Sequence, residues 1–212
     1  PLTWRLGARP LDHSPEVRVR ELVQLALVAQ EEGAQPPRFR LKPALVQQVA
    51  YDSLSFAGRR RLHHRLAAHL EEMHSAEPEP LYETLAHHYR LSGDSPKTLF
   101  YSLKAGDKAR QVFAHREAQE YYRLCLSTLR RLGGPVGQPS SYILERIGDC
   151  HEASGHHREA AQAFSSALRA WSAAARGAPA LPSALPDLGV GVSPRDRESL
   201  LRCKVGISWE RN

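Results

Sequence analysis

This 212-residue sequence has little of what marks a secreted or membrane-spanning protein. Its three cysteines are few, odd in number and far apart, which argues against a disulfide framework and favours a reducing, intracellular setting. The longest apolar runs, such as LVQLALVA, are far too short to span a bilayer. Position 1 is proline, and no charged-then-apolar leader follows it. We therefore expect a soluble, cytoplasmic piece of a longer protein.

The motifs that bind nucleotides or activate nucleophiles are also missing. The sequence contains no G-x-x-x-x-G-K-[ST] loop, no G-x-G-x-x-G fingerprint and no nucleophile elbow. The serines, cysteines and carboxylates show no linked triad. Cys125 falls in a small-residue position of a helix repeat, where packing explains it. We expect no catalytic residue, no cofactor and no metal ligand in this chain.

Helix-forming residues dominate what is present. Alanine, leucine, glutamate, arginine and glutamine recur with apolar residues at three- and four-residue spacing, which predicts a mainly α fold. Proline and glycine break this pattern in SAEPEP (75–80), GGPVGQPS (133–140) and RGAPALPSALPDLGVGVSP (176–194). The last of these stretches is predicted to be a linker.

The N-terminal part, residues 1–75, predicts a partial winged-helix-like unit. A helix begins at Ser14-Pro15-Glu16, where serine caps, proline fits the first turn and glutamate complements the helix dipole. Residues 26–41 then read as a short β-hairpin, with the alternating RFRL as its second strand. A helical segment follows. Helix, hairpin and helix follow one another in the second half of a winged-helix unit.

Residues 79–175 carry the spacing of tetratricopeptide repeats, in which small residues mark the contact between two helices. The clearest frame is Gly148-x2-His151-x3-Gly155-x4-Ala160-x3-Phe164-x2-Ala167. Related frames begin at Ala86 and Gly106, only 20 residues apart, so one helix from about residue 96 to 113 is predicted to serve two neighbours. A fourth frame begins at Gly206, which makes residues 195–212 the first helix of a truncated further repeat. The prediction is an α-solenoid of helix hairpins.

The histidines invite a metal-site interpretation, but their spacing favours a structural one. Gly155 ends a helix before His156, so His151 and His156 are not expected to face each other as an i,i+4 pair, and HEASGH is one residue too long for H-E-x-x-H. His64, His69 and His74 are five residues apart and spread around a helix. His87 and His88 are adjacent and expected to point apart. A metal-dependent enzyme is therefore the least favoured function.

Two groups of arginines are candidate contacts for a partner or a polyanion: Arg59, Arg60 and Arg61 at a helix start, and Arg116, Arg123 and Arg130 at seven-residue spacing. The alternative is a solvated helix face, since glutamates are interleaved with the second group. A positive run at a helix start is unfavourable to the helix dipole. The net charge of +6 does not by itself indicate nucleic-acid binding, which remains an alternative in the form of a DNA-binding regulator that uses the winged-helix unit.

Residues 38–72 resemble the junction after the ATPase module of STAND-type ATPases, many of which carry class III adenylate or guanylate cyclase domains and tetratricopeptide repeats. The positions that match the family pattern are Ala44, Leu45, Ala50, Tyr51, Ser53, Leu54, Arg60, Arg61, Leu62 and His63. Residues 85–109 are similar to the first repeat of that family, and the resemblance covers about residues 26–132. Pro43 stands where the family usually has histidine.

This resemblance implies a non-catalytic regulatory region of a signalling protein. The catalytic parts of the family lie upstream of such a region, and none is carried over to this chain. The expected ligand is a protein or peptide partner in the repeat groove, or the upstream ATPase module of the same polypeptide. Ligand binding would then shift an equilibrium between a docked and an open state.

Overall fold

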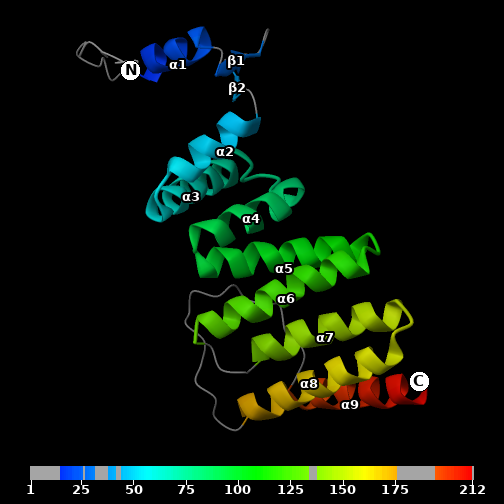
Figure 1. Ribbon diagram of the computed structural model, residues 1–212. Helices are drawn as coiled ribbons and strands as arrows, with labels where there is room; N and C mark the ends of the chain where they lie inside the picture. The colour runs from blue at the N-terminus through cyan, green and yellow to red at the C-terminus, as the bar shows by residue number, and fades with distance from the viewer. Residues whose placement is uncertain are drawn as a thin grey trace, which may run out of the picture. The chain divides into compact units, whose positions relative to one another are not determined.

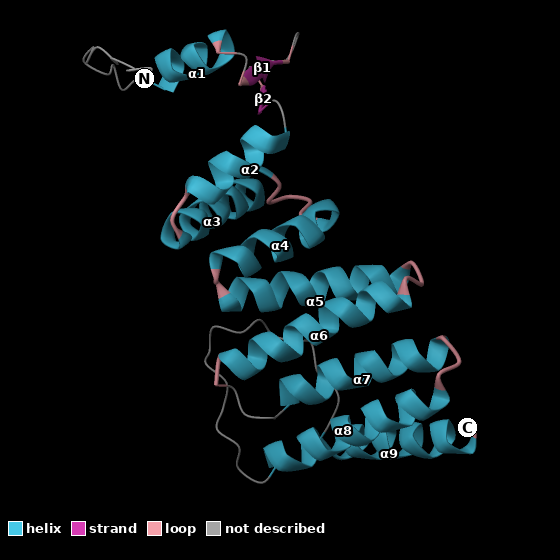
Figure 2. Cartoon of the chain, viewed as in Figure 1, coloured by secondary structure: helices cyan, strands magenta, loops and turns pink. Residues whose placement is uncertain are grey.

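The computed structural model describes residues 15–25, 27–31, 38–41, 44–133, 138–175 and 194–211. In this part of the chain the fold is mainly α-helical, as predicted, with a single two-stranded sheet (Figures 1 and 2). The chain divides into two compact units, Pro1–Arg59 and Arg60–Asn212. Each unit is described by itself below.

The first unit contains the elements α1 (Pro15–Gln24), β1 (Val28–Gln30), β2 (Phe39–Leu41) and α2 (Ala44–Ser53). The two strands pair antiparallel, with Val28 opposite Leu41 and Gln30 opposite Phe39. Both strands lie inside the range predicted for the hairpin. The order along the chain is therefore helix, hairpin and helix.

The second unit begins within α3 (Phe56–Met73). It continues through η1 (Glu79–Leu81), α4 (Tyr82–Ser92), α5 (Ser95–Gln111), α6 (His115–Arg131), α7 (Gln138–Ala153), α8 (His157–Ala175) and α9 (Pro194–Glu210). From α4 to α9 each helix packs against the next one in the chain (Figure 1). Helix α5 packs against both α4 and α6, which confirms the predicted shared helix. The helices in the described ranges include none that is both long and apolar enough to cross a bilayer.

Glycines mark two close contacts between successive helices in this unit. A Cβ atom on Gly148 of α7 would overlap the ring of Phe164 on α8, and one on Gly106 of α5 would lie 2.7 Å from Cε1 of Tyr122 on α6. Both rings are fully buried. In each pair the ring comes 16 residues after the glycine. The frames predicted at Gly106 and Gly148 are thus confirmed as helix-to-helix contacts, because only glycine leaves room for the ring.

Helix α9 closes the described part of the chain and packs on α8. Leu201 is fully buried in a cluster with Ala167 and Trp171 of α8. The predicted linker, residues 176–194, lies outside the described residues except for Pro194, which begins α9.

Candidate functional site

The turns that follow α4, α5 and α7 share one backbone conformation but not one residue type. Gly93 and Gly155 have φ angles of 81° and 75°, and Phe113 at the equivalent frame position has a φ of 62°. In the left-handed region an L-residue brings its Cβ too close to the following carbonyl oxygen, which costs about 1–2 kcal/mol. Glycine escapes this penalty. Phe113 therefore sits where the fold itself favours glycine.

Burial does not compensate for this backbone strain. Phe113 is 81% exposed, and the neighbouring Val112 is 69% exposed. The Phe113 ring makes an edge-to-face contact with the ring of His115, with 6.1 Å between the centroids. His115 is itself only partly buried. Strained backbone positions cluster at binding and active sites, which makes Phe113 a candidate binding residue.

A shallow depression of about 450 Å³ lies beside Phe113. It is lined by residues of the α5–α6 turn, the first two turns of α6 and the end of α7, namely Phe113, Ala114, His115, Arg116, Glu117, Glu120 and Ser154. The depression thus combines an exposed aromatic ring with charged side chains of both signs. We call Val112, Phe113 and this lining the Phe113 surface.

The three arginines predicted as one stripe on α6 are all exposed. Arg116 lines the depression, and Arg123 donates a hydrogen bond to Oε1 of Gln119 at 3.0 Å. Burial, and secondarily the charge of Arg123, lower the pKa of His151 at the end of α7. The stripe therefore runs from the Phe113 surface past the end of α7, and its first member belongs to that surface.

The arginines at the start of α3 have mainly structural contacts. Within the first unit, the Arg59 guanidinium donates to the carbonyl oxygens of Leu54 at 3.1 Å and Asp52 at 2.9 Å, and it lies 4.6 Å from the centre of the Tyr51 ring. Arg59 also pairs with the Asp52 carboxylate at 3.4 Å. These contacts satisfy carbonyl groups at the end of α2, where positive charge is favourable. These contacts explain why position 59 carries a positive charge, although positive charge near the N-terminus of α3 is by itself unfavourable.

Within the second unit, Arg60 has a comparable task. Its Nε donates to the carbonyl oxygen of Ser92 at 2.8 Å, which ties α3 to the end of α4. Arg61 is exposed. The structure therefore does not gather the predicted arginine run into one surface, since Arg59 and Arg60 are each directed to a helix end.

A histidine cluster between α3 and α4 was missed by the sequence reasoning. Nδ1 of His63 lies 3.0 Å from Nδ1 of His88, and the two rings stack with centroids 5.2 Å apart. His87 also contacts His88 edge to face at 5.2 Å, so the expectation that these neighbours point apart is wrong. Burial, with the charge of His87 second, lowers the pKa of both His63 and His88.

This cluster predicts an acid-sensitive fold. Because the pKa of His63 and His88 is lowered in the folded chain, the unfolded chain binds more protons once the pH falls below the usual histidine value of 6.5, and stability is lost there. We expect a smaller free energy of unfolding in urea at about pH 5.5 than at about pH 7.5. The double variant His63→Asn, His88→Asn should lose less on acidification, whereas the exposed His69→Asn should lose as much as the parent. An equal loss in all three proteins would contradict the assignment.

His151 and His156 do not form a pair on one helix face, as expected, because His151 lies in α7 and His156 lies in the turn that follows it. Their rings make an edge-to-face contact with centroids 6.0 Å apart, because the chain reverses at Gly155 and the amide of His156 donates to the carbonyl of His151 at 2.9 Å. In the ranges that the structure describes, histidines, cysteines and carboxylates form no group of three that could hold a metal ion.

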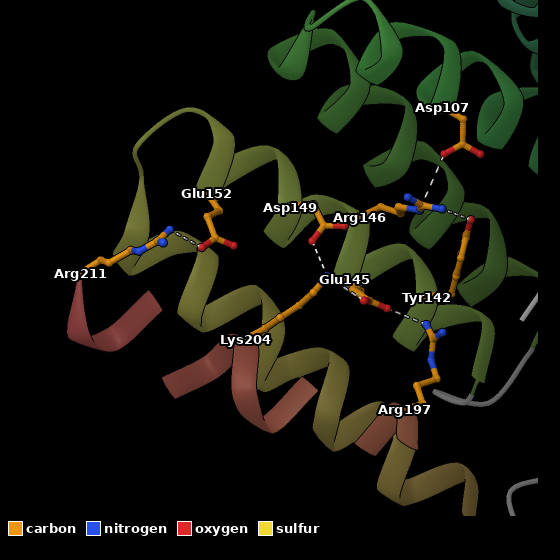
Figure 3. Close-up of polar contacts among 9 residues, drawn as sticks. All are labelled: Asp107, Tyr142, Glu145, Arg146, Asp149, Glu152, Arg197, Lys204 and Arg211. Carbon is orange, nitrogen blue, oxygen red and sulfur yellow. Dashed lines mark hydrogen bonds and ion pairs between the residues drawn. The ribbon is translucent and has the colours of Figure 1, made fainter. Parts of the chain in front are cut away.

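The second group that sequence reasoning missed is an ion network between α7 and α9 (Figure 3). Glu145 accepts hydrogen bonds from Arg197 at 2.7 Å and from Lys204 at 2.9 Å, and Lys204 also reaches Asp149 at 2.6 Å. We call these four residues the α7–α9 ion network. Arg211 pairs with Glu152 at 3.0 Å one turn further along α7.

A sequence signal for this network exists in both helices. The acidic residues 145, 149 and 152 are spaced for one face of a helix, and the basic residues 197, 204 and 211 recur every seven positions. An acidic row of side chains on α7 and a basic row on α9 indicate that these two helices lie close enough for the rows to pair. Burial opposes ionisation of Lys204, but its bonds and proximity to Asp149 and Glu145 outweigh this, so the pKa of Lys204 is raised.

Comparison with known proteins adds no relative: neither a known family nor a curated protein matches this chain.

Proposed function

We propose that this chain is a protein-interaction region built from tetratricopeptide-like helix repeats, and that it binds a partner protein or peptide at the Phe113 surface. The resemblance noted above further suggests that it is the regulatory region of a STAND-type ATPase or of an adenylate or guanylate cyclase-type protein. A single observation carries the binding proposal. Phe113 is 81% exposed at a φ of 62°, where glycine is found in the two equivalent turns.

The Phe113 ring lowers the stability of the free chain but offers apolar contact area to a partner. A phenylalanine at this φ destabilises the free chain by about 1–2 kcal/mol relative to an unstrained turn. Because the ring is exposed, burial of its apolar surface offsets little of this cost. In a complex, the same ring offers a large apolar area with few rotatable bonds, which is typical of residues that dominate binding energy. The adjacent depression gives a partner side chain a place beside the ring.

The test uses peptides selected from a displayed random library against the whole chain. We expect Phe113→Gly and Phe113→Ala to weaken binding of the selected peptides at least tenfold, because each removes the ring. Only Phe113→Gly should also raise the free energy of unfolding, by about 1 kcal/mol, because glycine relieves the strain and alanine does not. Titration calorimetry and urea unfolding measure the two effects.

The matched control is another exposed phenylalanine in ordinary helical conformation. Phe56 is 84% exposed at the start of α3, and Phe56→Ala should leave the affinity for the selected peptides unchanged. If the Phe113 variants bind the selected peptides as tightly as the parent chain does, the Phe113 surface is not the site. The purified chain is also expected to hydrolyse no nucleotide and to form no cyclic nucleotide, and either activity would contradict the proposed regulatory role.

A further inference from the structure

Helix α3 carries a row of side chains, mostly apolar, that is exposed in the described structure. Leu62 is 49% exposed, Leu66 is 43% exposed and Met73 is 67% exposed. His69 belongs to the same row and is exposed as well. The four positions follow one another at spacings of four, three and four residues, so they share one side of the helix. We call these four residues, all of which belong to the second unit, the α3 stripe.

The α3 stripe is not the side of α3 that packs into the repeats. Ala67 is fully buried, and Leu70 packs with it in a cluster that includes Leu85 and Tyr89 of α4. Positions 67 and 70 each come one residue after a stripe position, which turns them by about 100° around the helix axis. An exposed row at alternating spacings of four and three residues is the pattern of a coiled-coil contact.

The charges beside the α3 stripe favour an antiparallel copy of the same helix as its occupant. Arg65 and Glu72 each come one position before a stripe residue, so they flank the stripe on the side away from Ala67 and Leu70. Both are exposed, and neither pairs with an opposite charge in the part of the chain that the structure describes. Charged residues that flank a coiled-coil contact set the orientation of the two helices.

We propose that the α3 stripe binds the α3 stripe of a second copy of this chain, with the two helices antiparallel. The register places Leu62 opposite Met73 of the second copy and Leu66 opposite its His69, and two-fold symmetry makes each contact twice. The same register brings Arg65 opposite Glu72 of the second copy, again twice. A parallel pair would place His69 against His69 and would bring no acidic residue to Arg65.

The contact is small, because each helix contributes four residues and one of them is a histidine. The two flanking ion pairs lie at the rim, where they fix orientation more than they add affinity. We therefore expect a dissociation constant of about 10–100 µM, so that the chain is monomeric in dilute solution. The inference does not rest on the proposed function, since the Phe113 surface is formed by α5, α6 and α7.

Sedimentation velocity of the whole chain, at concentrations from about 5 to 300 µM, measures this equilibrium. We expect Leu66→Glu to raise the dissociation constant at least tenfold, because it places a charge in the middle of the apolar contact. Ala68 is exposed on α3 outside the stripe, and Ala68→Glu is the matched control that should leave the dissociation constant unchanged. Circular dichroism should show that both variants keep their helices.

Charge reversal tests the antiparallel register. Arg65→Glu alone and Glu72→Arg alone should each weaken the dimer, because like charges then face each other twice. The double variant Arg65→Glu, Glu72→Arg should restore the dimer. An equimolar mixture of the two single variants should form a heterodimer, since each chain then supplies the charge that the other lacks.

Three results would overturn the proposal. The first is a chain that stays monomeric at about 300 µM, which would leave another segment of the chain or a different protein as the occupant of the α3 stripe. The second is a dimer that Leu66→Glu leaves intact, since its interface would then lie elsewhere. The third is a double charge variant that associates no better than the single variants do, because the proposed register predicts recovery.

Discussion

Replacing Glu145 with alanine is expected to lower the free energy of unfolding by about 3 kcal/mol or more. The Glu145 side chain is only 10% exposed and the Arg197 side chain 6% exposed. Removing the carboxylate leaves the Arg197 cation buried beside the rings of Tyr142 and Trp171, at 5.7 and 5.4 Å, with no other ion partner in the described part of the chain. An uncompensated buried charge costs far more than an exposed pair contributes. Urea unfolding measures the loss, and hydrogen exchange should show α9 opening first.

The chain supplies a matched control on α9 itself. Glu198 and Arg202 form an ion pair at 2.8 Å, with side chains 39% and 68% exposed. Glu198→Ala should therefore change stability by no more than about 0.5 kcal/mol. The double variant Glu145→Leu, Arg197→Leu should be more stable than Glu145→Ala, because it leaves no unpaired charge. If Glu145→Ala and Glu198→Ala cost the same small amount, the α7–α9 ion network is not a buried one.

The helical repeats could be predicted from the sequence because their signal is local. Small residues at fixed spacing from Gly106 and Gly148 specify close helix contacts, and these contacts are made by the next helix along the chain. The shared helix α5 followed from the 20-residue distance between two frames. Each of these inferences needed only neighbouring elements of the chain.

The contacts that could not be predicted depend on how elements face each other. His63 and His88 are 25 residues apart, and nothing in their spacing indicates that α3 brings one ring onto the other. The fate of Arg59 and Arg60 was also hidden, because each side chain reaches a carbonyl group that sequence patterns do not describe. A run of like charges looks the same in sequence whether it faces solvent or helix ends.

Phe113 shows a further limit of sequence reasoning. Phe113 comes seven residues after Gly106, as Gly155 comes seven residues after Gly148. From the sequence alone, phenylalanine instead of glycine at this turn indicates only a looser match to the repeat. The φ of 62° together with 81% exposure turns that departure into the best candidate for a binding residue. The backbone angle and the exposure are properties of the fold, and the spacing of residues in the sequence shows neither of them.

Alanine at Gly148 and alanine at Gly206 are expected to change stability in opposite directions, although both glycines hold the same frame position in a helix. At Gly148 the new Cβ overlaps the fully buried ring of Phe164, so α7 and α8 must move apart or the ring must leave its rotamer. Overpacking of this kind outweighs the better helix propensity of alanine, and the variant should be about 1–2 kcal/mol less stable.

At Gly206 no atom of the residues that the structure describes lies within 4 Å of the new atom, so we expect only helix propensity to change. Gly206→Ala should therefore be about 0.5–1 kcal/mol more stable than the parent in urea unfolding. A loss of stability at Gly206, or a gain at Gly148, would contradict the helix packing described here.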